Sequence, residues 1–253
     1  MEKNGNRRTA PVIWMDSVDS TNTRLKELAR EGAAHGTALI ARRQTGGRGR
    51  SGRSFESPPG GLYLSLLLCP DCPPECTVSL TAVSALAVRR AVGRACGRFP
   101  DIKWPNDLLL DGRKICGILT EQSFTGKALQ VVIGVGINVN TGLEDFSPEL
   151  RRKLGSLLSQ TGRRTEIDVL AGLVLEELDG IYAVWLQDGG RLLEEYREAC
   201  VTRNREVIIL QNGKMRRAKA LEINDDFSLS VLTEAGEERV SFGEVSVRGL
   251  EGE

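Results

Sequence analysis

The spacing of apolar residues changes near residue 201, and this change limits the folds open to the chain. Before it, segments with helical and with strand-like spacing alternate. After it, short strand-like segments follow at intervals of about ten residues, with turn signals such as Asn212-Gly213 and Ala235-Gly236 between them. They are residues 207–210, 217–223, 229–232 and 239–242. We expect a small SH3-like β-barrel at residues 203–253, appended to a larger domain at residues 1–202.

The larger domain is predicted to be α+β, a mixed β-sheet with flanking helices. Ser20, Thr21 and Asn22 are candidate N-caps for a helix, because apolar residues follow them at helical spacing. Further helices are predicted at residues 77–98 and, two or three in number, between residues 147 and 200. Strands are predicted at residues 37–41, 62–68, 102–104, 115–124 and 129–139, and a polar loop at residues 42–61.

Charge and composition exclude several classes of protein. The 253 residues carry 34 Lys plus Arg and 34 Asp plus Glu, so they lack the basic excess typical of nucleic-acid-binding proteins. No apolar run approaches a membrane span, and the polar start at residues 1–8 has no apolar core of a secretory signal. Six cysteines without such a signal indicate reduced thiols. We expect a cytoplasmic protein that binds neither DNA nor membranes.

Three cysteines, Cys69, Cys72 and Cys76, lie close together in a Pro-rich segment. A zinc site would need a fourth ligand, such as Cys96 or Cys116, and no second close pair of ligands exists. The only histidine, His35, is expected in a distant polar turn. We therefore predict a Pro-rich loop and no metal site.

Residues 44–54 carry the strongest chemical signal, with four glycines and three arginines in eleven residues. Guanidinium groups suit phosphate or carboxylate, and glycine lets the backbone approach a ligand closely. The run is a near match to a phosphate-binding loop, but Arg53 replaces its lysine and a strand follows where that motif needs a helix. A solvated basic loop is the alternative interpretation.

Two further segments carry candidate ligand-binding residues. Lys103-Trp104-Pro105-Asn106-Asp107 precedes Lys114, which opens an apolar strand, so its ammonium would lie at the edge of a buried sheet and attract an anion. Taken alone, Lys114 would by default be interpreted as a surface lysine. Residues 134–140 contain Gly134 and Gly136 but lack the third glycine of a dinucleotide fingerprint, so these glycines are expected to permit close approach to a strand.

Together these segments resemble the biotin protein ligases over nearly the whole chain. The matching segments, in order, are residues 19–22, 47–53, 103–107, 114 with 117, 134–140 and 243–248. The resemblance implies a catalytic domain similar to class II synthetases and an SH3-like C-terminal domain. It implies a ligase that uses ATP and Mg²⁺ to activate biotin as biotinyl-5'-AMP and transfers it to a lysine of a biotin carboxyl carrier domain. A homodimer is compatible with the family.

The resemblance also implies roles for single residues. Catalysis would rest on Lys114, Arg48 and Arg50. Biotin would be bound by Ser20, Thr21, Asn22, Gln44, Arg48, Gly49, Arg50, Lys114 and Gly117. The nucleotide would be bound by Arg50, Arg53, Phe55, Asn106, Asp107 and Asn138. These cations suit the chemistry, because adenylation brings a carboxylate and a phosphate together, and a closing loop would protect the reactive anhydride from water.

Two departures from the family pattern stand out. Phe55 replaces the tryptophan that commonly follows the glycine–arginine run, so an indole N–H is absent there. About fifteen residues precede Asp16, too few for a DNA-binding winged helix. We therefore expect a ligase of the monofunctional type, without repressor function. A lipoate ligase, a nucleic-acid-binding module and a biotin sensor without catalysis remain alternatives.

Overall fold

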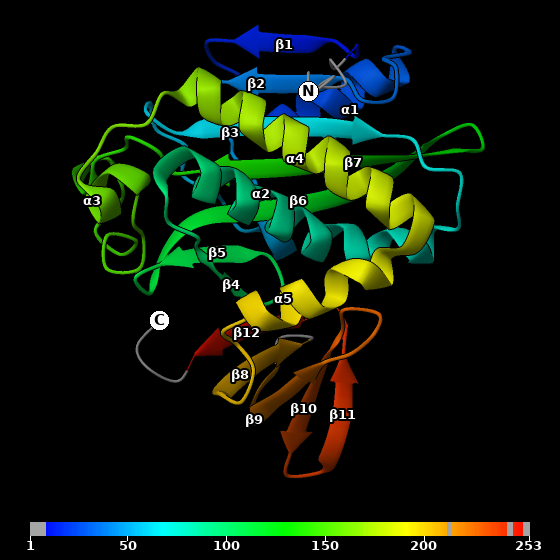
Figure 1. Ribbon diagram of the computed structural model, residues 1–253, viewed down its shortest axis with the longest axis vertical. Helices are drawn as coiled ribbons and strands as arrows, with labels where there is room; N and C mark the ends of the chain where they lie inside the picture. Colours follow the sequence, from blue (N-terminus) through cyan, green and yellow to red (C-terminus); the bar gives the residue numbers. More distant parts are fainter. Residues whose placement is uncertain (1–8, 212–213, 242–244, 250–253) are drawn as a thin grey trace, which may run out of the picture.

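A computed structural model describes residues 9–211, 214–241 and 245–249 of the chain. Its larger part is one seven-stranded sheet in the order β1-β2-β3-β7-β6-β5-β4 (Figure 1). Only β1 and β2 pair in parallel, and all other neighbours in this sheet are antiparallel. The strands are β1 (Val12–Met15), β2 (Ala38–Ala41), β3 (Leu62–Leu68), β4 (Asp101–Lys103), β5 (Asp107–Leu110), β6 (Arg113–Thr125) and β7 (Ala128–Ile137). The predicted mixed sheet is confirmed.

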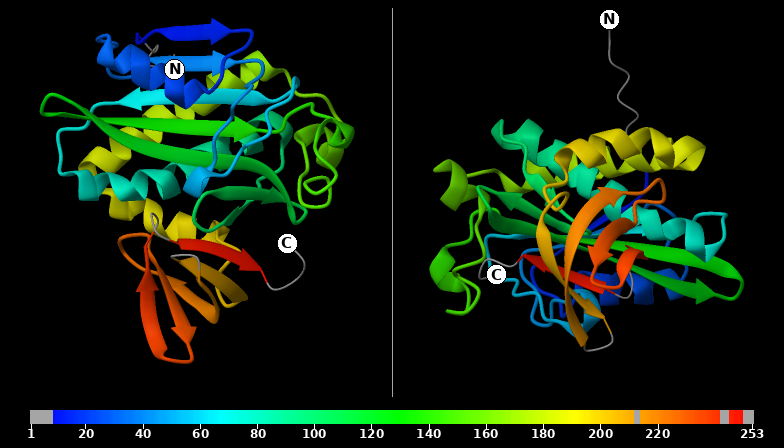
Figure 2. Two further views of the ribbon diagram at one scale, coloured as in Figure 1. Left: turned by 180° about the vertical axis from the view of Figure 1, so that it is seen from behind. Right: turned by 90° about the horizontal axis from the view of Figure 1, so that it is seen from below.

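Helices cover both faces of this sheet. Two long helices cross the face seen in Figure 1, and α1 lies on the opposite face, seen in Figure 2, left. The helices are α1 (Thr21–Arg30), α2 (Leu80–Cys96), α3 (Leu157–Thr161), α4 (Ile167–Asp188) and α5 (Leu193–Ala199). Short 3-10 helices are η1 (Arg50–Gly52), η2 (Pro74–Ser79), η3 (Leu143–Asp145) and η4 (Gly189–Leu192). Because both faces are covered, the central strands β3 and β7 are apolar along almost their whole length.

Helix α1 begins where the sequence predicts it. The Ser20 hydroxyl accepts a hydrogen bond from the Thr23 amide at 3.4 Å, which caps the helix. Leu25 and Ala29 lie one helical turn apart and pack on buried residues of β2, β3 and β7. The residues just before and at the start of α1 are thereby held against the middle of the sheet.

On the other face, α2 packs against α4 and the sheet. Within the part of the chain that the structure describes, the stretch Pro74–Cys96 has the length and apolar composition of a membrane span, and most of it is buried in this core. It begins as the 3-10 turn η2 and ends at Gly97, whose left-handed backbone terminates the helix.

The C-terminal part is a second, antiparallel sheet in the order β11-β10-β9-β8-β12, which is consistent with a small SH3-like domain. Its strands are β8 (Glu206–Gln211), β9 (Lys214–Ile223), β10 (Leu229–Thr233), β11 (Gly236–Val240) and β12 (Val245–Gly249). The predicted Asn212-Gly213 turn and residues 242–244 lie outside the described residues. The division between residues 202 and 203 stays a prediction.

The two sheets share one continuous apolar core. The indole Nε1 of Trp104 donates a hydrogen bond to the Phe227 carbonyl at 2.9 Å, and its amide N donates to Thr202 Oγ1 at 2.9 Å. The rings of Tyr196 and Phe227 meet edge to face at 5.5 Å. The C-terminal sheet therefore packs directly behind the turn between β4 and β5.

Several elements differ from the sequence-based predictions. Strand β1 was not predicted, since it is a short edge strand with alternating exposure. Strand β5 was not predicted either, because the chain turns back directly after Pro105 and pairs with β4. Residues 147–156, expected to start a helix, form turns instead.

The cysteine-rich loop holds one correction. His35 is not distant from it, because the Cys69 amide N donates to His35 Nδ1 at 3.0 Å. Cys69, Cys72 and Cys76 are free thiols in the loop after β3 and in η2. Among residues 9–211, 214–241 and 245–249, no group of three or more His, Cys, Asp or Glu side chains could hold a metal ion.

Candidate active site

A pocket of about 610 Å³ opens on the face of the sheet that carries α1. It is bounded by the start of α1, the loop of residues 44–57, the turn between β4 and β5, strands β6 and β7, and residues 149–154. These segments are far apart in sequence. The antiparallel pairing of β6 with β5 and β7 brings the strands together, and the packing of α1 on the sheet adds the start of that helix.

Three glycines form the floor of the pocket. Gly117 of β6 pairs with Gly136 of β7, and Gly134 lies two residues along the same face. A Cβ atom on Gly134 would lie 2.2 Å from Asn22 Oδ1, and one on Gly136 would lie 2.5 Å from the Phe55 ring. Any side chain there would collide with these neighbours, so the glycines let Asn22 and Phe55 rest directly on the sheet.

One end of the pocket is a buried polar network. Gln44 Oε1 accepts from the Thr21 amide at 2.8 Å and from the Thr21 hydroxyl at 3.1 Å. The Ser65 hydroxyl lies 2.8 Å from Thr21 Oγ1 and 2.6 Å from Asn22 Oδ1. Asn22 Nδ2 in turn donates to the Leu119 carbonyl at 3.2 Å. These contacts fix the orientation of each group that faces the cavity.

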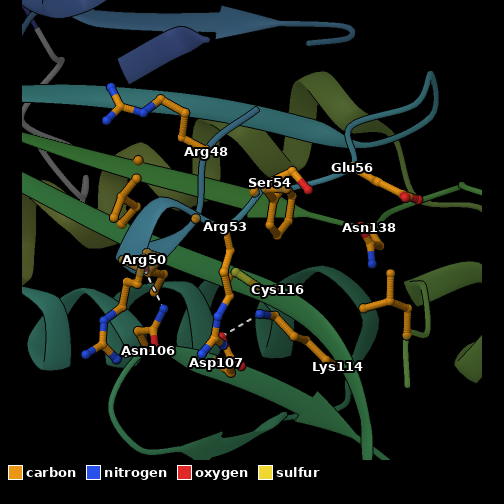
Figure 3. Close-up of a pocket in the computed structure, with 18 of the residues that line it drawn as sticks. Arg48, Arg50, Arg53, Ser54, Glu56, Asn106, Asp107, Lys114, Cys116 and Asn138 are labelled. Atoms are coloured by element: carbon orange, nitrogen blue, oxygen red, sulfur yellow. Dashed lines mark hydrogen bonds and ion pairs between the residues drawn. The ribbon is translucent and has the colours of Figure 1, made fainter. Parts of the chain in front are cut away.

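Cations gather in the middle of the pocket (Figure 3). Lys114 Nζ lies 2.7 Å from Asp107 Oδ1, and both side chains are about three-quarters buried. Arg50 Nη1 donates to Asn106 Oδ1 at 3.1 Å. Burial lowers the pKa of Arg50, an effect that the nearby Asp107 carboxylate opposes. A guanidinium and an ammonium thus line the same part of the pocket, where an anion would be strongly attracted.

Arg48 points away from this cluster in Figure 3. Its Nη2 lies 3.4 Å from Glu121 Oε1, and the same carboxylate contacts Lys26 Nζ and Asn22 Nδ2, each at 2.9 Å. Burial acts to raise the pKa of Glu121, but the hydrogen bonds from Lys26 and Asn22 and the charges of Lys26 and Arg48 outweigh it, so the pKa is lowered. Glu121 therefore stays ionised, and its ion pair with Arg48 holds that side chain at the polar end of the pocket.

Phe55 and Asn138 mark the other side of the cavity. The Phe55 ring lies over the glycine floor, with Lys114 Nζ 5.9 Å from its centroid. Asn138, on the loop after β7, donates from Nδ2 to the Gly155 carbonyl at 2.9 Å. Its Oδ1 is buried and has no hydrogen-bond partner among the described residues. A buried amide oxygen of this kind is costly to leave unpaired, which suits it to accept a hydrogen bond from a ligand.

The structure brings every predicted site residue to this one pocket. Its lining includes Ser20, Thr21, Asn22, Gln44, Arg48, Gly49, Arg50, Arg53, Phe55, Asn106, Asp107, Lys114, Gly117 and Asn138. The sequence analysis did not select Ser65 and Glu121, which both form hydrogen bonds with the Asn22 side chain and so fix its orientation. Ser65 could have been found, since its small hydroxyl side chain interrupts the otherwise apolar strand β3.

Comparisons with known proteins identify the family of the chain. The sequence profile of the biotin/lipoate A/B protein ligase family matches residues 14–138. A bifunctional ligase/repressor BirA of Bacillus spizizenii is 35% identical over 241 residues, which are 93% of this chain and 74% of the relative. This chain belongs to the biotin protein ligase family.

Two other comparisons agree. A biotin–[acetyl-CoA-carboxylase] ligase of Paracoccus denitrificans is 42% identical over 125 residues, 48% of this chain and 52% of the relative. A biotin protein ligase from Aquifex aeolicus, solved with biotin and ATP, is 30% identical with a TM-score of 0.83, covering 94% of this chain and 99% of that one. The chain thus spans about half to three-quarters of the curated relatives and the full length of the Aquifex structure.

The family prediction, the fold and the ligase class are confirmed, and ATP and biotin are the substrates of that class. The ligase pocket also suits the Mg²⁺ that accompanies ATP. Mg²⁺ on nucleotide phosphates usually takes one or two protein carboxylates, and Glu56, Asp107 and Glu149 line the cavity.

Proposed function

We propose that this chain activates biotin with ATP and transfers it to a lysine of a biotin carboxyl carrier domain. In the first step an oxygen of the biotin carboxylate attacks the α-phosphorus of ATP, and the bond to pyrophosphate breaks. In the second step the lysine amine attacks the carbonyl carbon of biotinyl-5'-AMP, and AMP and a proton leave. The observation that carries the proposal is the pairing of a buried cation cluster with a polar end in one pocket.

The polar end supports the assignment of the biotin ring. Its ureido group presents N–H donors and a carbonyl acceptor, and a buried ring needs partners for all of them. Thr21, Gln44 and the N-cap residue Ser20 offer hydroxyl and amide groups of both kinds, already oriented by one another. Asn22 is oriented by Ser65 and Glu121. The apolar part of biotin would lie along the glycine floor.

Lys114 and Arg50 support the adenylation step. The approach of a carboxylate to a phosphate joins two anions, and fixed cations in a largely buried site offset their repulsion without reorganising. Asp107 and Asn106 hold these two cations in place within the pocket. Arg48 would join them once biotin arrives, by leaving Glu121. Such a change is compatible with the loop, because glycines such as Gly49 and Gly52 allow backbone conformations that other residues resist.

The nucleotide is assigned to Arg53, Phe55, Asn106, Asp107 and Asn138. The unpaired Oδ1 of Asn138 suits the exocyclic amino group of adenine, the donor that distinguishes adenine from guanine at that position. Phe55 offers an aromatic face for stacking but no indole N–H.

The partner we propose is a carrier domain of a biotin-dependent carboxylase, with the chain acting in the cytoplasm without DNA or a membrane. The six free thiols agree with a reducing compartment. Formal neutrality argues against nucleic acid. A homodimer would have the outer edge of β1 available, where Val12 and Trp14 are exposed.

The test of adenylation is isotope exchange between pyrophosphate and ATP, measured with biotin, with lipoate and with neither acid. Because exchange requires reversible formation of the acyl-adenylate, the proposal predicts exchange that depends on biotin. Exchange with lipoate alone would support a lipoate ligase instead. Tight biotin binding without any exchange would indicate a sensor that lacks catalysis.

A further inference from the structure

A second cavity, of about 640 Å³, lies outside the candidate active site. It is bounded by the loop between β3 and α2, the end of α4 and the turn between β9 and β10, and none of its described lining residues also lines the active-site pocket. Two cysteines that the proposed function does not use, Cys72 and Cys76, line this cavity together. Both are free thiols, and Cys76 is exposed while Cys72 is half-buried.

The chain reverses tightly between these two cysteines. Pro73 and Pro74 stand between them, and the Cys76 amide N donates to the Pro73 carbonyl at 3.1 Å. The Pro74 carbonyl accepts from Gln122 Nε2 at 3.1 Å and from the Thr77 hydroxyl at 2.9 Å, so β6 and η2 hold the turn in place. A disulfide forms only where the chain brings two Cβ atoms to about 4 Å from each other. A fixed, tight turn between close cysteines favours this approach.

The two thiols are in contact and differ in their surroundings. Burial raises the pKa of the Cys72 thiol, and the charge of Cys76 and a hydrogen bond with its side chain raise it further. Cys72 therefore keeps its proton at neutral pH, whereas Cys76 is the exposed member of the pair and meets a dissolved reagent first. An exposed thiol beside a shielded one is the arrangement of an attacking and a resolving cysteine.

The other cysteines are placed less well for such chemistry. Cys116 and Cys200 are buried, and Cys96 Sγ donates a hydrogen bond to the backbone of its own helix, α2. Cys69 is exposed, but its amide N is held by His35 and it does not line the second cavity. Among the described residues no third ligand completes a metal site with the pair. The pair therefore suits covalent chemistry between its own two sulfur atoms.

We propose that Cys72 and Cys76 are a site of reversible disulfide formation, oxidised by low-molecular-weight disulfides. The Cys76 thiolate attacks one sulfur of the small disulfide, whose S–S bond breaks, and one small thiol is released. Cys72 then loses its proton and attacks Cys76 Sγ in the mixed disulfide, and the second small thiol leaves. The protein gives up two protons and two electrons, and the small disulfide is reduced to two thiols. An excess of small thiols reverses both steps.

The test is incubation of the folded protein with oxidised glutathione, followed by alkylation of the remaining thiols and mass spectrometry. Glu75 lies between the two cysteines, so glutamate-specific proteolysis separates them into two peptides that only a disulfide can keep joined. We expect joined peptides, lighter by two hydrogen atoms than the sum of the two reduced peptides. Dithiothreitol should separate them.

Cys72→Ser removes the resolving thiol. Glutathione should then accumulate on Cys76 about tenfold more than in wild type, because a neighbouring thiol acts at a high effective concentration and clears the mixed disulfide. The matched control is Cys69→Ser, which changes an exposed cysteine of the same loop that does not line the second cavity. It should form the disulfide as wild type does.

Three results would overturn the inference. Stable glutathione adducts on wild type without joined peptides would show that the two sulfur atoms cannot meet, and thiols that all stay free would show that neither reacts. Joined peptides that disappear in Cys69→Ser would assign the bond to Cys69 and Cys76 instead. No step of the test uses biotin or ATP, so a failure of the proposed function would leave this inference unaffected.

Discussion

Lys114 Nζ lies 2.7 Å from Asp107 Oδ1, so a carboxylate holds the central cation of the pocket. The two residues come from adjacent antiparallel strands, β6 and β5. A substrate anion must therefore compete with Asp107 for the ammonium group. The competition is possible because the pair is only about three-quarters buried and one ammonium can donate three hydrogen bonds.

Lys114→Ala is expected to slow adenylation by roughly 100-fold or more while changing biotin affinity far less, because the charge matters most where two anions meet. Single-turnover formation of biotinyl-5'-AMP and calorimetric binding of biotin measure the two effects. Equal losses in both would show that Lys114 serves ground-state binding only.

Gly134→Ala is expected to weaken biotin binding, because the new Cβ would lie 2.2 Å from Asn22 Oδ1 and displace that amide. Gly172→Ala is the matched control, since this glycine lies in α4 and an added Cβ would meet no atom within 4 Å. The control should bind biotin normally and gain about 0.5–1 kcal/mol of stability from higher helix propensity. Normal biotin affinity in Gly134→Ala would refute the proposed position of Asn22.

The lowered pKa of Glu121 leads us to expect a specific pH dependence of the free energy of unfolding. Its pKa in the folded protein lies below the ordinary value of 4.5, so the ionised carboxylate stabilises the fold above that pH. This contribution is lost as the pH falls from 4.5 through the lowered pKa. Thermal denaturation of wild type and Glu121→Gln between about pH 3 and about pH 7, a range that spans the titration of carboxylates, measures it. The stabilities of the two proteins should converge in acid, and a constant difference would contradict the assignment.

Trp104→Phe tests the junction between the two sheets. The variant removes the indole N–H that donates to the buried Phe227 carbonyl and leaves a small cavity. We expect a loss of about 2 kcal/mol in the free energy of unfolding. Trp14→Phe, at an exposed position on β1, should change it by no more than about 0.5 kcal/mol. Urea denaturation of both variants checks the difference.

The candidate residues for binding biotin and the nucleotide were predictable from the sequence, because they lie in short motifs that follow one another in a fixed order. Lys114, Arg50 and Asn138 could be named without any structure, and all three line the pocket. Their hydrogen-bond and ion-pair partners in the folded state could not be predicted from the sequence. That Arg48 pairs with Glu121 depends on how the loop lies across β6, which no local pattern specifies.

Contacts and strands that depend on pairing between distant strands could not be predicted from the sequence either. Ser65 reaches Asn22 only because β3 pairs with β7, with Ser65 opposite Gly134. Strand β5 follows a turn whose proline suggested that the strand had ended, and the reversal is stabilised by pairing with β4 and β6. The strongly apolar strand β3, by contrast, has the predicted bounds, because its apolar run is clear by itself.

Biotin transfer is tested by mass spectrometry of a biotin carboxyl carrier domain after incubation with this protein, MgATP and biotin. We expect a single biotin adduct on one lysine with wild type and with Gly172→Ala, and its loss with Lys114→Ala. An adduct of equal yield with Lys114→Ala, or no adduct with a folded wild-type protein that binds biotin, would contradict it.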